Sequence, residues 1–364
     1  SLTGERMKHL LSIALIVCAL LSHVGCGRQT SRPTSQAPPT PKEPPMRISG
    51  PHSHENLTIF LVHGADTLQA AKYLTLAEAI DQKKLVVHET GNVGELLIEN
   101  VGDEDVYIQS GEIVKGGRQD RTLGTDMIVT RAMGKVPIPS FCVEQGRWKQ
   151  RGSESAFAFS GGSKEMVAGK DMKLASNVRS GYGDQSKVWA AVAQHQQVLT
   201  ANVGAPVASP ASPSSFQLAM ENKDLNNKLD GYIKDLCNTP DNRDDVIGWA
   251  YAVNGKISGA NVYANHELFA KLWPKLLKSG AVEALAEFRA AQAAPAAQPT
   301  ASEVEAFLSA AESRAPTTQP VNVRTSVATS SAESCVVIQT DDLAAGRWVH
   351  RNYLVTPPTE KPAR

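Results

Sequence analysis

The run "VIGWAYAVNGKISGANVYAN", residues 246–265, decides the fold class. Strand-like residues flank its central pair, Asn254-Gly255, on both sides. An Asn-Gly pair tolerates the positive φ angles of a type I′ turn, whose twist matches that of two antiparallel strands. The run therefore predicts a β-hairpin.

Other strand-like runs, separated by turn residues, lie before and after this hairpin. They are residues 56–64, 84–90, 94–101, 104–117, 125–132 and 135–145, followed much later by 333–355, which should form a closing hairpin. Short strands at this spacing predict an antiparallel β-sandwich or a barrel-like core. If the closing hairpin pairs with the early sheet, the two ends of the domain close the core.

Apolar residues recur at helical spacing in three longer runs, residues 185–201, 216–236 and 266–292. Pro274 should kink the last of these helices or begin a second one. Capping-box spacing predicts two shorter helices, one begun by Thr75 with Glu78 and one by Ser302 with Glu305. The predicted fold class is therefore α+β, with several helices packed on the β core.

Residues 1–26 are expected to be a signal peptide that ends in a lipobox. Basic residues precede the apolar run 10–21, which is too short for a stable membrane-spanning helix. Gly25 and Cys26 match the motif in which the cysteine receives lipid, although His23 stands where leucine is usual. The alternative is ordinary signal cleavage beside a chance cysteine. We expect an extracytoplasmic protein that is anchored to a membrane by lipid on Cys26. Gly27, which follows this cysteine, favours the outer membrane and the periplasm.

The remaining chain is expected to form one α+β domain, residues 52–355. Before it, residues 27–51 should be a disordered tether, because their Pro, Ser, Thr and Gln side chains cannot bury a core. Similar composition near 204–215 and 293–301 predicts flexible insertions, and residues 356–364 should be a loose tail.

Charge and cysteine content exclude several protein classes. Lys+Arg and Asp+Glu both number 37, so the basic excess typical of nucleic-acid binding is missing. Three cysteines follow the first 26 residues, namely Cys142, Cys237 and Cys335, and they allow at most one disulfide. The sequence has no metal-binding Cys/His spacing and no G-x-S-x-G elbow, so we expect no metal and no cofactor.

The first candidate for a binding site is "SGEIVKGGRQDR", residues 110–121. Gly116-Gly117 permits a tight turn whose backbone N–H groups could cradle an anion. Arg118 and Arg121 could bind a phosphate or carboxylate group. The alternative is a solvated rim on which these arginines pair with nearby acids, namely Asp120, Glu112 or Asp126.

The second candidate is "FCVEQGRW", residues 141–148. Cys142 and Arg147 form a C-x-x-x-x-R spacing similar to sulfurtransferase and phosphatase loops, in which a nearby helix N-terminus lowers the thiol pKa. The alternative for Cys142 is a small buried core residue. The neighbouring carboxylate, amide, guanidinium and indole suit a sugar or nucleotide site, or an ion pair packed under a tryptophan. These groups belong to Glu144, Gln145, Arg147 and Trp148.

These two segments occur in order with "HENLTIF" (54–60), "YLTLAEAI" (73–80), "ELLIEN" (95–100) and "LWPKLL" (272–277). Together they resemble the bacterial ADP-ribosylglycohydrolase- and rhodanese/phosphatase-superfamily-associated proteins, from about His52 to Val355. The resemblance implies no established activity, because the family name records an association with enzymes. It does imply a family pattern in both segments, made of Glu112, Gly116, Gly117, Gln119, Arg121, Cys142, Glu144, Gln145, Gly146, Arg147 and Trp148.

Three functions follow as hypotheses. The first is a non-enzymatic, membrane-anchored domain that binds a partner or a small anionic or sugar ligand. Its ligand-binding candidates are Gly116, Gly117, Arg118, Gln119, Arg121, Gln145, Arg147 and Trp148. The second is an enzyme acting on an ADP-ribose-like or other phosphorylated sugar, with an acid/base among Glu112, Asp120 and Glu144 and with arginines as anion clamps. The third is a thiol enzyme that uses Cys142.

Overall fold

The computed structural model describes residues 45–156, 158–160, 165–289 and 297–357. All of them belong to one compact unit, Pro44–Arg364, which is distinct from Ser1–Glu43. The expected signal peptide, Cys26, most of the tether and the end of the tail lie outside the described residues. Among the described helices, none combines the length and the apolar character needed to span a bilayer.

An eight-stranded antiparallel sheet dominates this unit. Its strands, in spatial order, are β1 (Arg47–His54), β2 (Leu57–His63), β12 (Val246–Val253), β13 (Lys256–Tyr263), β17 (Arg347–Val355), β16 (Cys335–Asp342), β15 (Thr325–Ser331) and β14 (Thr317–Pro320). The predicted hairpin is confirmed as β12–β13, because Val253 pairs with Lys256 across Asn254 and Gly255 at φ 50° and 74°. Every residue of β12 and β2 is buried, so these strands form the centre of the core.

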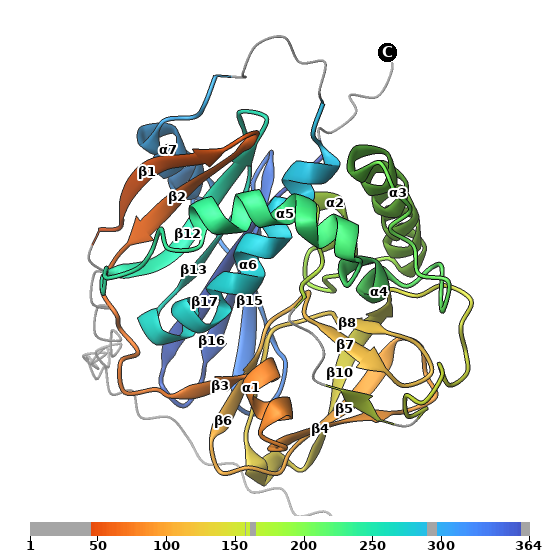
Figure 1. The fold of residues 1–364 in the computed structure, drawn as a ribbon. Coiled ribbons are helices and arrows are strands. Elements are labelled where there is room, and N and C mark those ends of the chain that lie inside the picture. Colours follow the sequence, from red (N-terminus) through yellow and green to blue (C-terminus); the bar gives the residue numbers. More distant parts are fainter. Residues whose placement is uncertain (1–44, 157, 161–164, 290–296, 358–364) are drawn as a thin grey trace, which may run out of the picture. The chain divides into compact units, whose positions relative to one another are not determined.

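The sheet curls until it is nearly closed. Helix α7 (Ala301–Ala311) contacts β1 at one edge and also β16 near the other edge. The closing hairpin β16–β17 joins the sheet through pairing of β17 with β13. The fold is thus α+β with a barrel-like antiparallel core, and the early and late strands share one sheet as expected (Figure 1).

Two smaller sheets lie beside the barrel-like one. The six-stranded sheet has the order β11 (Phe159–Ser160), β7 (Ile113–Gly116), β8 (Arg121–Leu123), β10 (Lys135–Cys142), β5 (Glu95–Asn100) and β4 (Leu85–Glu89). The three-stranded sheet has the order β3 (Tyr73–Thr75), β6 (Asp105–Ile108) and β9 (Met127–Val129), and β3 runs parallel to β6. The strand-like run 104–117 contains two strands, β6 and β7, because the chain bends at Gly111, with φ +91°, and continues in a different sheet.

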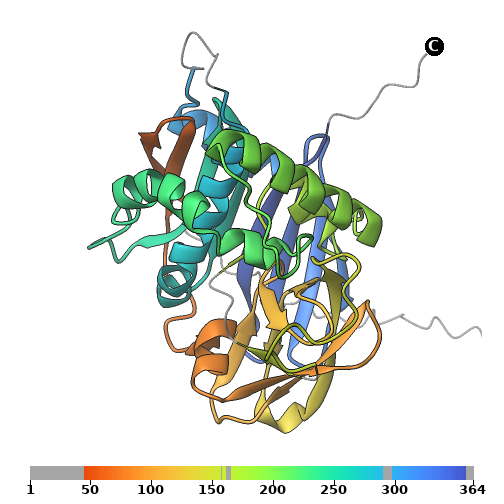
Figure 2. The ribbon, with the colours of Figure 1, turned by 45° about the vertical axis from the view of Figure 1, so that its right-hand side comes forward.

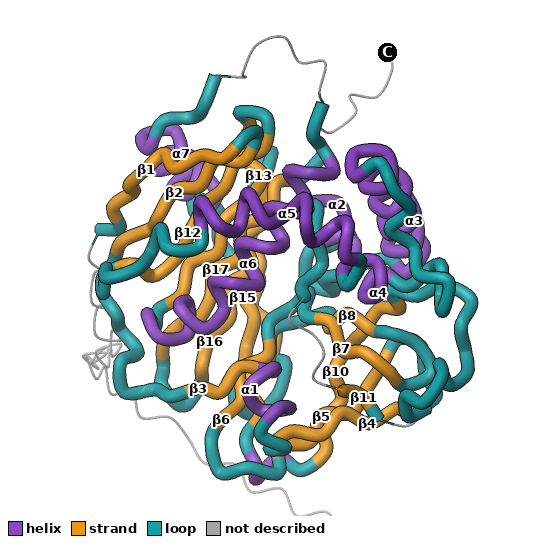
Figure 3. Tube along the Cα trace, in the orientation of Figure 1, coloured by secondary structure: helices purple, strands orange, loops and turns teal. Residues whose placement is uncertain are grey.

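Helices cover the barrel-like sheet and reach the six-stranded one. Helix α6 (His266–Ala286) packs on β12, β13 and β2, and α5 (Lys223–Leu236) packs on α6 and β1 (Figure 2). Helix α3 (Gln185–Val203) contacts β10, α2 (Lys170–Ala175) and α4 (Phe216–Met220) (Figure 3). These contacts place the N-terminal ends of α3 and α4 beside the segments that carry both candidate sites.

Capping residues explain where the helices differ from expectation. The capping box of α1 (Leu76–Asp81) is confirmed, with Thr75 bonded to Glu78. The single helix expected over 216–236 is instead α4 and α5, because the Asn222 side chain caps a new helix at Leu225 N. Helix α7 is capped by Thr300 with Glu303, two positions before the expected pair. Pro274 lies inside one continuous helix and begins no second one.

The boundaries of the folded unit also differ from expectation. Strand β1 begins at Arg47, so the fold starts before His52 and includes the end of the expected tether. Residues 204–215 contain the buried side chains of Val207, Ser212 and Ser215, so this segment packs on the domain. The 3-10 helix Arg131–Met133 is the remaining short element between β9 and β10.

Candidate functional site

The turn between β7 and β8 needs both of its glycines. Gly116 and Gly117 have φ of +121° and +53°. A Cβ atom at Gly116 would lie 2.9 Å from the Ala158 carbonyl oxygen, and one at Gly117 would lie 2.3 Å from Phe159 Cζ. The tight turn expected from the sequence is present, and it packs against β11.

The segment after β10 folds onto this turn. The Asp120 backbone N–H donates to Glu144 Oε2 at 2.9 Å, and Gln119 Nε2 donates to the Glu144 carbonyl oxygen at 2.9 Å. The Val143 N–H donates to the Asp120 carbonyl oxygen at 3.1 Å. The two candidate segments, far apart in sequence, therefore form one structural unit.

A buried ion cluster holds this unit together. Arg147 Nε lies 2.6 Å from Glu144 Oε1, and Arg151 Nη1 lies 2.8 Å from Asp120 Oδ2 and 2.9 Å from Glu144 Oε1. All four side chains are less than a tenth exposed. Buried charges persist only when opposite charges and hydrogen bonds compensate them, and here two carboxylates face two guanidinium groups.

The cluster keeps Glu144 ionised. Burial alone would raise the pKa of Glu144, but hydrogen bonds from Arg147 and Ser212 hold this pKa below its ordinary value. The other N–H groups of Arg147 donate hydrogen bonds to the carbonyl oxygens of Gly116, Gly117 and Lys149. Glu144 and Arg147 are therefore both engaged within the unit in this structure.

Sequence reasoning missed Arg151 and Ser215, which complete the cluster. The Ser215 hydroxyl donates to Asp120 Oδ2 at 2.7 Å and accepts from Leu218 N at 3.0 Å as the N-cap of α4. Ser215 stood in a Pro/Ser-rich run that reads as a linker. Arg151, four positions after Arg147, carried no local pattern that distinguishes it from a surface arginine.

Two of the three guanidinium nitrogens of Arg121 make no hydrogen bond with the described residues. Its side chain is fully buried, and Nη1 donates to the Gln119 carbonyl and side-chain oxygens, both at 3.2 Å. Among the described residues, Nε and Nη2 have no hydrogen-bond partner, although Glu89 Oε1 lies 3.9 Å from Nη2. Burial lowers the pKa of Arg121.

Trp148 lies against both Arg121 and Arg118. The centre of its ring is 5.5 Å from Arg121 Cζ and 5.3 Å from Arg118 Cζ, and the side chain is 40% exposed. Arg118 is half-buried, and no carboxylate among the described residues lies within ion-pairing distance of its side chain. Within the described parts of the chain, Arg118 and Arg121 therefore make no ion pair with Asp120, Glu112 or Asp126 on a solvated rim.

Cys142 is a core residue in this structure. Its side chain is fully buried, Sγ lies 3.0 Å from the Glu144 carbonyl oxygen, and burial raises the pKa of the thiol. Its backbone N–H and carbonyl bond to the side chain of Gln185 at the start of α3. An activated nucleophile needs a lowered pKa and access to solvent, and Cys142 has neither.

The remaining candidates lie away from this unit or at its edge. Glu112 is buried and pairs with Lys275 on α6. Gln145 and Gly146 are exposed. They line an open depression of about 910 Å³ together with residues 147, 149–154, 209, 211–214 and Leu218. Asp126 lies apart from this unit, where it bonds to His350 of the barrel-like sheet and to Tyr107 of the three-stranded sheet.

The described residues contain no group of three or more His, Cys, Asp or Glu side chains placed to hold a metal ion. Comparison with curated proteins gives no match, and comparison with solved structures gives none either. A family model, the ARG and Rhodanese-Phosphatase-superfamily-associated Protein domain (ARPP-1), matches residues 45–354. The chain therefore belongs to the ARPP-1 family, as its motifs suggested.

Proposed function

We propose that this domain is a non-catalytic binding protein for a small anionic ligand, such as a phosphorylated sugar. The observation that carries the proposal is the fully buried Arg121, whose Nε and Nη2 make no hydrogen bond with the described residues beneath the exposed ring of Trp148. These two N–H groups form one edge of the guanidinium, the edge that can bind two oxygens of a phosphate or carboxylate side by side.

The unpaired edge is unfavourable without a ligand. A buried donor that loses water and gains no acceptor destabilises the folded state by about 1–3 kcal/mol, and more when the group is charged. An anion that accepts from Nε and Nη2 would recover this free energy on binding. Glu89 reduces the local positive charge but is not within hydrogen-bonding distance of the edge.

Arg118 and Trp148 suit the outer part of such a ligand. Arg118 supplies a second positive charge without a carboxylate partner among the described residues, and it is accessible from solvent. The exposed part of the indole offers a flat apolar surface on which a sugar ring or nucleobase can stack. An anionic group with an attached ring therefore fits this arrangement better than a bare inorganic ion.

The same geometry favours binding over catalysis. General acid/base catalysis works best with a pKa near the working pH, whereas the pKa of Glu144 is held below its ordinary range. Asp120 is bonded to Arg151 and Ser215, and Cys142 is buried. The enzyme hypothesis would need one of these groups to be released on substrate binding.

Thermal-shift and calorimetric titrations of the purified protein test the binding proposal. Ribose 5-phosphate and ADP-ribose should raise the melting temperature, because a ligand of the folded state stabilises it, whereas ribose should not. Arg118→Gln should weaken binding about tenfold, the loss expected for one charge-assisted hydrogen bond. Arg131→Gln is the matched control, since Arg131 is a well-exposed arginine paired with Asp103.

Two outcomes would count against the binding proposal. One is an equal stabilisation by ribose and ribose 5-phosphate, which would show that the anion is not recognised. The other is unchanged affinity in Arg118→Gln. Release of ribose or phosphate from ADP-ribose during the titration would instead support the enzyme alternative, and chromatography of the titrated sample measures it.

We also propose that lipid on Cys26 tethers the domain to a bacterial membrane on the extracytoplasmic side. The basic and apolar residues before Gly25 and Cys26 support this proposal. Cys26→Ala should prevent incorporation of labelled palmitate and move the protein from the membrane fraction to the soluble fraction. Labelling of the variant at the wild-type level would contradict lipidation at this cysteine.

A further inference from the structure

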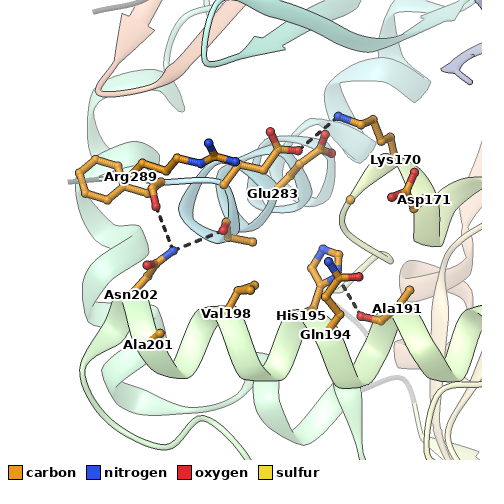
Figure 4. A pocket seen from close by; sticks show the side chains of 14 residues that line it. Lys170, Asp171, Ala191, Gln194, His195, Val198, Ala201, Asn202, Glu283 and Arg289 are labelled. Carbon is orange, nitrogen blue, oxygen red and sulfur yellow. Dashed lines mark hydrogen bonds and ion pairs between the residues drawn. The ribbon is translucent and has the colours of Figure 1, made fainter. Parts of the chain in front are cut away.

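A second pocket lies among the helices and shares no residue with the Arg121 site. It has a volume of about 380 Å³ and is lined by residues of α2, α3 and the C-terminal part of α6 (Figure 4). Apolar side chains form part of its wall, namely Ala191, Val198, Ala201, Ala286 and Phe288. Polar side chains also line it, among them Glu283 of α6 and His195 of α3 (Figure 4).

Glu283 presents an unused acceptor to this pocket. The side chain is 1% exposed, and its Oε2 accepts from the Tyr251 hydroxyl at 2.9 Å and lies 3.5 Å from Lys173 Nζ. Its Oε1 is buried and has no hydrogen-bond partner among the described residues. A buried carboxylate oxygen without a donor is unfavourable, so a ligand that donates to Oε1 would be stabilised there.

His195 adds a second acceptor. Its Nδ1 lies 2.9 Å from the Ala191 carbonyl oxygen, which can only accept, so Nδ1 carries the proton. Burial lowers the pKa of His195, and the neutral ring therefore has an acceptor at Nε2. Gly169, at φ +80°, makes room for this atom, because a Cβ there would lie 2.4 Å from Nε2.

Charged side chains of both signs line the pocket. Asp171, Glu283 and Glu287 are acidic, Lys170 and Arg289 are basic, and Lys173 pairs with Glu283. The Lys170 ammonium is paired with Glu287 at 3.3 Å. A ligand ammonium would meet two acceptors inside the pocket, with apolar side chains around its carbon chain.

We propose that this pocket binds a small organic amine, whose ammonium group donates to Glu283 Oε1 and His195 Nε2. The ligand would be a short aliphatic amine or diamine, because the pocket volume leaves room for a few carbons beyond the ammonium group. The site is independent of the proposed anion site, so either proposal can fail without the other.

Isothermal titration calorimetry of the full protein with putrescine tests this proposal, with 1,4-butanediol as the uncharged analogue of equal length. Putrescine should bind and raise the melting temperature, whereas butanediol should do neither. Glu283→Gln should lower the putrescine affinity at least about tenfold, because it removes the charge that the ammonium group meets.

Glu283→Gln could also weaken the fold, because Glu283 bonds to Tyr251 and Lys173. A second variant therefore tests the pocket without changing Glu283. Ala201→Phe places a ring at an exposed lining position of α3 and should block putrescine while the melting temperature without ligand stays unchanged. Ala190→Phe, at an exposed position of the same helix that does not line the pocket, should bind like the wild type. The proposal is overturned if putrescine does not bind, if butanediol binds equally well, or if Ala201→Phe retains the wild-type affinity.

Discussion

At Cys142, the sulfur lies 3.0 Å from the Glu144 carbonyl oxygen and the side chain has no exposed surface. Burial raises the pKa of Cys142, and it raises the pKa of Cys335 to about 12. Cys237 is only half-buried. Since the thiolate is the reactive form and needs access to the reagent, iodoacetamide at pH 7.5 should modify Cys237 first, and Cys142 and Cys335 only after unfolding.

Peptide mass spectrometry at timed intervals, with and without guanidinium, measures the three rates separately. The native rate at Cys142 should be at least about tenfold lower than its rate in the unfolded chain, where the thiol has its ordinary pKa. Modification of native Cys142 as fast as in guanidinium would restore the thiol-enzyme hypothesis. It would also mean that the segment around residues 142–144 opens readily.

Single residues of the candidate site were only partly predictable. Gly116 and Gly117 follow from local chain geometry, so the turn could be recognised from the sequence. The partners of Asp120 could not, because Arg151 and Ser215 reach it from 31 and 95 positions away in the chain. Local spacing carries no information about contacts of that length. The unpaired edge of Arg121 is a property of its surroundings, which only the three-dimensional structure reveals.

At the scale of an element, Ser215 connects helix α4 to the ion cluster. It caps the helix through Leu218 N and also donates to Asp120 Oδ2. Ser215→Ala should destabilise the protein by roughly 2.5–4 kcal/mol, about 1 for the lost cap and about 1.5–3 for the lost bond to a buried charge. Urea unfolding followed by circular dichroism measures this loss as a lower midpoint.

Thr300→Ala is the matched control for this prediction. Thr300 caps α7 through Glu303 N, and it is exposed, with no buried carboxylate beside it among the described residues. Its removal should lower the free energy of unfolding by about 1 kcal/mol. Equal losses in the two variants would show that the bond from Ser215 to Asp120 contributes nothing measurable.

The elements themselves were predictable where local signals were strong and unopposed. The Asn254-Gly255 hairpin and the Thr75 capping box form their hydrogen bonds with residues nearby in the sequence. Tertiary contacts therefore did not change the local structure that the sequence predicts. The run 104–117 continues its strand pattern through Gln109–Glu112, yet Gly111 turns the chain into a second sheet there. Apolar periodicity predicted one helix over 216–236, but Asn222 caps a second helix within this range. Ser302 was the predicted cap of the last helix, but Thr300 occupies that position in the structure.

At the scale of the whole folded unit, buried carboxylates connect the barrel-like sheet to the smaller sheets. Asp126, next to β9, bonds to His350 of β17, Thr340 of β16 and Tyr107 of β6. Asp342 of β16 bonds to Arg324 and to Tyr73 of β3. The antiparallel class could be predicted from turns and alternation. The contacts between sheets could not, because they join residues more than 200 positions apart, such as Asp126 and His350.

These carboxylates predict how stability depends on pH. Burial alone would raise the pKa of Asp126 and of Asp342, but His350 and Arg324, respectively, hold each pKa below the ordinary 3.8. The pKa of Glu144 is likewise held below 4.5 by Arg147 and Ser212. The unfolded chain therefore binds protons before the folded protein does. The stabilisation is fully present above about pH 4.5 and is lost progressively as the pH falls through 3.8 and below.

Two other carboxyls act in the opposite direction. Burial raises the pKa of Glu165 and of Asp341, so their ionised forms destabilise the protein at neutral pH. That penalty disappears as the pH falls through their raised pKa values. Burial also lowers the pKa of His195, which reduces stability as the pH falls through 6.5. These opposite effects should leave the free energy of unfolding nearly constant between pH 7 and pH 4.5, after which it should fall steeply.

Urea unfolding at pH 7, 5.5, 4 and 3 measures this curve, and Asp342→Asn identifies one of its sources. The variant should be less stable at pH 7, because Arg324 and Tyr73 lose a charged partner, yet its stability should fall less between pH 4.5 and 3. For each unit by which folding depresses the pKa of Asp342, the acid-induced loss of unfolding free energy in the variant should be smaller than that in the wild type by about 1.4 kcal/mol. Asp103→Asn, at an exposed surface pair with Arg131, should leave the acid slope unchanged. A slope in Asp342→Asn as steep as in the wild type would mean that the contact between β16 and β3 does not govern acid unfolding, and that Asp126 and Glu144 carry it.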